Sequence, residues 1–259
     1  MATGRAVEGF LKRDRLVVLA GLVVVTALAW VYLMSLAAGM DDMGGVMSAM
    51  GRLGPWTAVD AVLMFVMWAV MMIGMMVPSA TPVILLYGLV CRRRGVGGRA
   101  LAPTGAFFAG YVTVWTVFSV VATAMQWGLE RAALLSPMMV STSPLFSGIV
   151  LIAAGLYQWT PYKDACLRRC RSPVEFLSTH WRDGALGAFV MGLEHGAYCL
   201  GCCWVLMALL FFGGVMNLLW VAAITVFVLV EKVAPFGRLV GRAGAGLLVL
   251  SGVAIIAIV

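Results

Sequence analysis

The chain has 259 residues, of which 63% are hydrophobic and 11% charged, with a mean hydropathy of +1.03 and a net charge of +7. Ordinary soluble domains carry about 25% charged residues. This composition therefore excludes a soluble globular fold, intrinsic disorder and a disulfide-stapled secreted scaffold. It predicts one polytopic helical membrane domain over residues 1–259.

Seven apolar segments approach the roughly 20 residues that a bilayer-spanning helix needs. The second is expected to continue past Pro78 and Pro82 to Val90 as a kinked helix, and the fifth is long enough to be tilted or broken. The predicted fold class is therefore all-α, a bundle of about seven transmembrane helices. The segments are Leu16–Ala38, Thr57–Val77, Ala106–Trp127, Leu145–Trp159, Ala185–Phe212, Val215–Val230 and Ala243–Val259.

The basic residues predict how the bundle is oriented. All Lys and Arg residues except Arg52 and Arg131 fall in the N-terminal tail or in the loops after the second, fourth and sixth segments. The positive-inside rule then places the N-terminus in the cytoplasm and the C-terminus outside. Because the basic residues flank membrane segments, they indicate contact with the lipid bilayer, and no nucleic acid partner is expected.

Between the first and second segments, residues 40–50 combine carboxylates and methionines. We expect a flexible, Gly-containing outer loop there. Thioethers are soft ligands that favour Cu(I), and carboxylates help to attract cations. The alternative is a mobile loop whose methionines anchor it at the membrane interface.

The second segment carries one acid and four methionines at helical spacing. They form a single stripe, with the acid about one turn inside the outer boundary. An intramembrane acid usually faces a cavity or a partner, so the stripe is a candidate copper path. The alternative is packing, because methionine fills gaps between helices. The stripe consists of Asp60, Met64, Met67, Met71 and Met75.

The fifth segment presents an imidazole and three thiols on one helical face, formed by His195, Cys199, Cys202 and Cys203. Met207 lies at one edge of that face, and Glu194 points toward another neighbour. Imidazole and thiolate ligands suit Cu(I), zinc or an iron–sulfur centre. The alternative is that the cysteines are small buried hydrophobes beside a hydrogen-bonded histidine.

A cytoplasmic segment adds two more thiols, Cys166 and Cys170. They would lie one turn apart and could share an ion if the segment is helical. Neighbouring arginines are expected to lower the pKa of these thiols and favour thiolates. The alternative is an interfacial loop in which the thiols have no role.

Four motifs resemble a bacterial family of predicted metal-binding integral membrane proteins of unknown function. They lie within residues 68–79, 155–173, 192–204 and 214–232. The resemblance implies metal binding and a place in the bacterial inner (cytoplasmic) membrane, but it implies no reaction. It does not cover the first segment or residues 40–50.

The favoured hypothesis is Cu(I) transport, or Cu(I) delivery to a periplasmic or membrane copper protein. Copper would pass from residues 40–50 along the stripe to the histidine and thiols, with Cys166 and Cys170 at the cytoplasmic end. No Walker-type phosphate loop is present to supply ATP. The alternatives are a membrane thiol-redox protein, a haem-associated or zinc-binding protein, and an accessory subunit of a larger complex. Nothing in the sequence indicates catalytic residues, since there is no serine nucleophile elbow and there are only two histidines.

Overall fold

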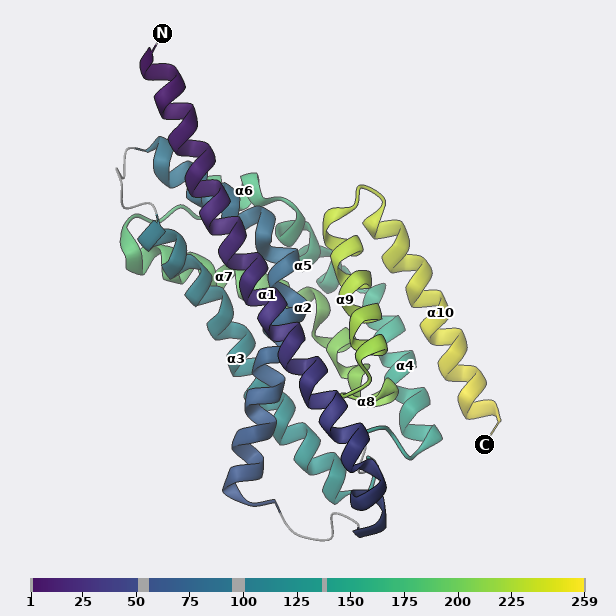
Figure 1. The fold of residues 1–259 in the computed structure, drawn as a ribbon. Coiled ribbons are helices and arrows are strands. Elements are labelled where there is room, and N and C mark those ends of the chain that lie inside the picture. The colour runs from purple at the N-terminus through teal and green to yellow at the C-terminus, as the bar shows by residue number, and fades with distance from the viewer. Residues whose placement is uncertain (1, 51–55, 95–100, 137–138, 259) are drawn as a thin grey trace.

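The computed structural model describes residues 2–50, 56–94, 101–136 and 139–258, and for residues 2–14 and 40–50 it describes the backbone alone. The all-α prediction is confirmed, because these ranges form helices and no strand (Figure 1). The helices are α1 (Ala2–Met50), α2 (Ala58–Arg93), α3 (Leu101–Arg131), α4 (Pro144–Gln158), α5 (Pro161–Arg171), α6 (Pro173–Thr179), α7 (Gly184–Ala208), α8 (Leu210–Gly213), α9 (Leu218–Val233) and α10 (Gly237–Ala257).

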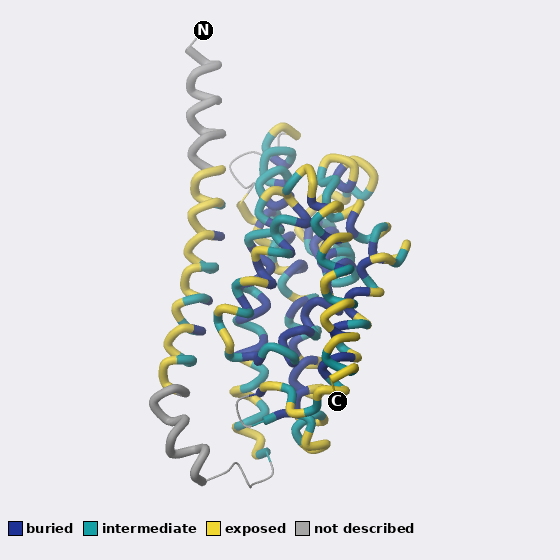
Figure 2. Tube along the Cα trace, turned by 90° about the vertical axis from the view of Figure 1, so that its right-hand side faces the viewer, coloured by how far each residue is buried: buried dark blue, intermediate teal, exposed yellow. Residues whose placement is uncertain are grey.

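The helices α1, α2, α3, α4, α7, α9 and α10 run alternately up and down the bundle (Figure 1). The short helices α5 and α6 lie toward the end at which α1 begins, whereas α10 ends at the opposite end (Figure 1). In Figure 2 the buried residues gather in the interior of the bundle, and the described side chains of α1 are mostly exposed. Such an exposed apolar helix has the pattern of a surface that faces lipid.

Five helices, and not seven, are long and apolar enough to cross a membrane within the described residues. They are Arg15–Gly39 of α1, α2, α3, Gly184–Gly213 and α10. The helices α4 and α9 have 15 and 16 residues. The apolar run of α4 is cut short because Thr160 and Pro161 begin α5, and that of α9 follows a turn in which Gly214 has a positive φ of 94°.

Helix α2 confirms the prediction of one helix that continues past its prolines. Pro78 has no N–H, which frees the carbonyl of Gly74 one turn earlier. The Trp30 indole of α1 donates a hydrogen bond to that carbonyl at 3.3 Å. A neighbouring helix thus satisfies the backbone group that the proline leaves open, as membrane helices require.

The segment 40–50 differs from the sequence-based expectation of a flexible loop, because α1 continues as a helix through Met50. The side chains of these residues lie outside the described part, so their proposed role as copper ligands stays a prediction. The fifth apolar segment is broken near its end, as expected, because α7 ends at Ala208 and the short α8 follows.

Glycines allow α3 and α7 to pack with their backbones in contact. A Cβ atom at Gly110 of α3 would overlap the carbonyl oxygen of Phe189, and one at Gly192 of α7 would overlap that of Phe107. Small residues at a crossing are how membrane helices approach closely. This contact holds the cysteine-bearing face of α7 at a fixed position in the bundle interior.

Candidate metal centre

Helix α5 positions two thiols that the sequence placed in a cytoplasmic segment. The Thr160 hydroxyl caps the helix by accepting the Lys163 backbone N–H at 3.2 Å, and Pro161 occupies the first turn. Arginines fill the last turn, where they complement the helix dipole. The segment is therefore helical, as sharing of an ion by its two thiols would require, and Cys166 and Cys170 lie one turn apart on it.

The two cysteine sets of the sequence meet in the structure. The Cys170 thiol interacts electrostatically with the thiols of Cys199 and Cys202 on α7. Cys166 packs against the backbone of Gly201, where an added Cβ would lie 2.9 Å from the Cys166 sulfur. We call Cys166, Cys170, Cys199, Cys202 and Cys203 the thiol cluster.

On α7 the three thiols of the cluster are buried. The sulfurs of Cys202 and Cys203 both donate to the backbone carbonyl of Cys199 at 3.0 Å. The Cys199 sulfur lies 3.1 Å from the Tyr111 hydroxyl of α3. The Cys203 sulfur lies 4.0 Å from the thioether sulfur of Met76 on α2. Five sulfur-bearing or polar side chains from three helices are therefore linked by contacts of Cys199 and Cys203.

A buried lysine completes the cluster. The ammonium of Lys232 on α9 lies 2.9 Å from the Cys199 sulfur, 3.8 Å from the Cys203 sulfur and 3.5 Å from the Ser79 hydroxyl. A buried charge is costly unless it is paired and hydrogen-bonded. Electrostatic attraction thus holds Lys232 beside the thiols. The lysine supplies one positive charge at the sulfur atoms of Cys199 and Cys203.

The expectation that neighbouring arginines leave the α5 thiols with a lowered pKa is wrong, because the net shift of both thiols is upward. Burial raises the pKa of the Cys166 thiol, and the opposing effect of Arg169 is smaller. The neighbouring thiols of Cys199 and Cys202 raise the pKa of the Cys170 thiol well above its usual value, and burial adds to the shift. Metal binding by these two thiols would therefore release protons.

His195 lies one turn before Cys199 and is buried beside three aromatic rings. The ring centroids of Phe107, Tyr111 and Phe176 lie 6.1, 6.0 and 5.2 Å from that of the imidazole. Its Nδ1 atom has no hydrogen-bond partner among the described residues. The imidazole therefore keeps one nitrogen that no described group uses.

Glu194 and Met207 lie apart from the contacts of the thiol cluster. Glu194 forms an ion pair with Arg182 at 2.7 Å, near the start of α7. This partner agrees with the expectation that Glu194 points away from the thiols. Met207 is buried in the apolar core one turn beyond Cys203.

The methionine stripe of α2 has other neighbours. Met64 is half-buried, and its sulfur accepts a hydrogen bond from Gln126 of α3 at 3.6 Å. Asp60 lies in the first turn of α2, where it forms a capping box with Thr57. The other members are buried in the core: Met67, Met71 and Met75. Met76, which is not a member of the stripe, is the α2 methionine whose sulfur contacts a thiol, that of Cys203.

Among the described residues, no group of three or more His, Cys, Asp or Glu side chains is arranged so that it could hold a metal ion. The thiol cluster therefore lacks the closed four-ligand geometry of structural zinc. Its donors are thiols and a thioether, the soft types that bind Cu(I). The donor set fits a low-coordinate copper ion better than zinc.

Sequence reasoning did not select Met76, Tyr111 or Lys232 as members of the site. Two signals could have indicated Lys232 and Tyr111. The pair Glu231–Lys232 places two charges at the end of an apolar helix, and Tyr111 is a polar group within the apolar α3. Polar groups in such helices are functional candidates by default.

The fold and the site together define a protein with long apolar helices and a buried, soft-ligand cluster. The chain belongs to the PpoB2 family, described as copper chaperones, whose model matches residues 65–255. The match includes the whole thiol cluster, Met76 and Lys232. The description names copper, and neither zinc nor haem. No curated protein and no solved structure matches the chain.

Proposed function

We propose that this copper chaperone is an integral membrane protein that holds Cu(I) at the thiol cluster and delivers it to a copper protein. The observation that carries this proposal is the meeting of α5 and α7 thiols beside the Met76 thioether. Thiolates and thioethers select Cu(I) over the harder divalent ions. Transfer between sites with few soft ligands requires no change of oxidation state.

The charges of the site support a monovalent cargo. Cu(I) bound by two thiolates carries a net charge of −1, and the Lys232 ammonium beside Cys199 and Cys203 would bring it to zero. A neutral set costs far less to bury than a charged one. We therefore propose that Lys232 is the counter-ion of the copper site and not a ligand.

The exposed surface supports a location in the membrane. Large apolar side chains face outward along α1, α3 and α10, as at Leu28 (63% exposed), Val117 (61%) and Leu250 (68%). Together with the five long apolar helices, this surface fits lipid. We propose that the start of α1 lies in the cytoplasm and the bundle in the bacterial inner membrane, which the distribution of basic residues supports. The recipient would be a membrane or periplasmic copper protein.

The direct test is Cu(I) binding by the purified protein, titrated anaerobically against a chromogenic Cu(I) chelator. We expect about one tightly bound Cu(I) per chain, and its loss in the double variant Cys199→Ser/Cys203→Ser. Cys91→Ser is the matched control, because Cys91 is buried but interacts with Tyr87 of its own helix. Equal copper in the double variant and the wild type would contradict the proposal.

A thiol-redox protein is the second candidate, and the interacting thiols of Cys170 and Cys199 favour it. An oxidant could join such neighbours as a disulfide between α5 and α7. Negligible Cu(I) in every variant, with two thiols lost on mild oxidation in the wild type and none in Cys170→Ser, would support this candidate over copper handling.

A further inference from the structure

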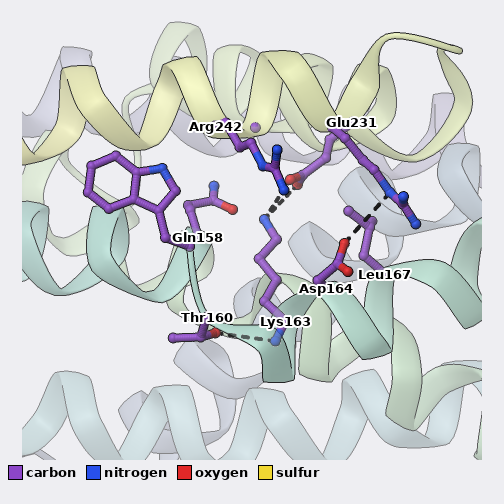
Figure 3. A pocket seen from close by; sticks show the side chains of 10 residues that line it. Gln158, Thr160, Lys163, Asp164, Leu167, Glu231 and Arg242 are labelled. Atoms are coloured by element: carbon purple, nitrogen blue, oxygen red, sulfur yellow. Dashed lines mark hydrogen bonds and ion pairs between the residues drawn. The ribbon is translucent and has the colours of Figure 1, made fainter.

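A cavity of about 70 Å³ lies apart from the thiol cluster, between the end of α4, the start of α5, and helices α9 and α10 (Figure 3). One water needs about 10–15 Å³ of such space, so the cavity has room for a larger group. Its lining is mostly polar, in contrast to the rest of the bundle. The polar and charged lining residues are Gln158, Thr160, Lys163, Asp164, Glu231, Arg238 and Arg242.

Gln158 lacks partners in this cavity. Its side chain is 8% exposed, and neither its Nε2 nor its Oε1 atom has a hydrogen-bond partner among the described residues. In Figure 3 its amide lies between α4 and the Lys163 side chain. Buried amides in folded proteins are almost always hydrogen-bonded. The unused amide therefore indicates a ligand that the cavity receives.

The charges around the cavity favour an anion. Lys163 and Glu231 neutralise one another at 2.7 Å. Asp164 lies 3.2 Å from Arg168 and 3.6 Å from Arg238. The guanidinium of Arg242 makes no hydrogen bond or ion pair with any described residue and keeps its charge unpaired. The α5 helix, 11 residues long, also begins at the cavity and directs its positive dipole end toward it.

We propose that this cavity binds a phosphate group, with Arg242 and the Gln158 Nε2 amide as donors and the positive dipole end of α5 adding electrostatic attraction. Guanidinium groups recognise phosphate through charge-assisted hydrogen bonds. The cavity lies at the end of the bundle at which α5 begins. Trp159 lines it and is 51% exposed, which is typical of aromatic residues at a membrane interface. Basic pockets between helices on the cytoplasmic side suit anionic lipid headgroups. The phosphate can therefore belong to a phospholipid or be free.

The first arm of the test measures phospholipid retention. Purified protein is incubated with phosphatidylglycerol or phosphatidylcholine vesicles, and bound lipid is counted by native mass spectrometry. We expect the wild type to retain phosphatidylglycerol about tenfold more strongly than Arg242→Gln or Gln158→Leu. Arg15→Gln is the control, since Arg15 is an exposed arginine of α1 that does not line the cavity.

The second arm measures the shift in melting temperature caused by inorganic phosphate in delipidated protein. A shift in the wild type that Arg242→Gln abolishes, without lipid retention, assigns the site to free phosphate. Retention of phosphatidylglycerol without such a shift assigns it to a lipid headgroup. If Gln158→Leu fails to fold, the Arg242→Gln variant alone tests the site. The Arg242 side chain makes no hydrogen bond or ion pair with any described residue, so its replacement should not disturb the fold. Equal lipid retention and equal phosphate shifts in wild type and Arg242→Gln would overturn the proposal.

Discussion

The α7 members of the thiol cluster and the methionine stripe of α2 both follow helical spacing, but their surroundings differ. On α7 the cysteine face meets α5, the Tyr111 hydroxyl and the Lys232 ammonium. On α2 the stripe meets Gln126 and the apolar core, where Trp68 packs on Phe211 with ring centroids 5.4 Å apart. Spacing fixes which residues share a face, and only packing decides what that face contacts.

The largest effect is expected from Cys170→Ser, which removes the α5 thiol that interacts with Cys199 and Cys202. Loss of a group outside the ligand shell typically costs about 10–100-fold in metal affinity, so loss of a ligand should cost more than about 100-fold. Chelator competition with Cu(I) measures this change. An affinity equal to that of Cys91→Ser would show that α7 binds copper without α5.

Lys232→Gln is expected to weaken Cu(I) binding by about 10–100-fold, because the buried copper dithiolate loses its counter-ion. Lys232→Arg, which keeps the charge, should recover part of the affinity. The same competition assay measures both variants. Tighter binding by Lys232→Gln would instead mean that the ammonium competes with copper for the sulfurs.

Gly201→Ala tests the close approach of α5 to α7. The new methyl group would lie 2.9 Å from the Cys166 sulfur, and such overpacking costs about 1–3 kcal/mol. We expect a lower melting temperature and roughly tenfold weaker Cu(I) binding. Gly128→Ala is the control, since no atom lies within 4 Å of its added Cβ. Equal effects of the two variants would argue against the packing of Cys166 on Gly201.

The smallest effect is expected from methionine substitutions, which compare Met76 beside the thiols with Met67 of the stripe. Met76→Leu should weaken Cu(I) binding by a few-fold to about tenfold, because it removes the thioether beside Cys203. Met67→Leu should leave the affinity unchanged, with a stability cost below about 1.5 kcal/mol for an isosteric core change. An equal loss of affinity in both variants would restore the stripe as a copper ligand.

Much of the fold could be predicted from the sequence. Hydrophobic runs and prolines gave the all-α class and the continuous α2. The lengths of α4 and α9, 15 and 16 residues, were also predicted correctly. What failed was counting them among the spans, because both fall short of the roughly 20 residues that a spanning helix needs. The cysteines were selected correctly as a cluster on α7, since they share a helical face.

The convergence of the site could not be predicted in the same way. Cys166 reaches α7 because Gly201 leaves room for its sulfur, a tertiary contact that no spacing encodes. Lys232 follows an apolar run and resembles an interfacial anchor in sequence, yet its side chain is buried at the thiols. Residues whose role depends on a partner from another helix become visible only in the folded chain.

The most direct test of the central claim is X-ray absorption at the copper edge of the Cu(I)-loaded protein. The measured quantity is the number of sulfur neighbours of copper in wild type and in Cys170→Ser. We predict a sulfur-only shell of two or three atoms that loses one sulfur in the variant. A shell dominated by nitrogen or oxygen, or the same sulfur count in both proteins, would contradict a copper site shared by α5 and α7.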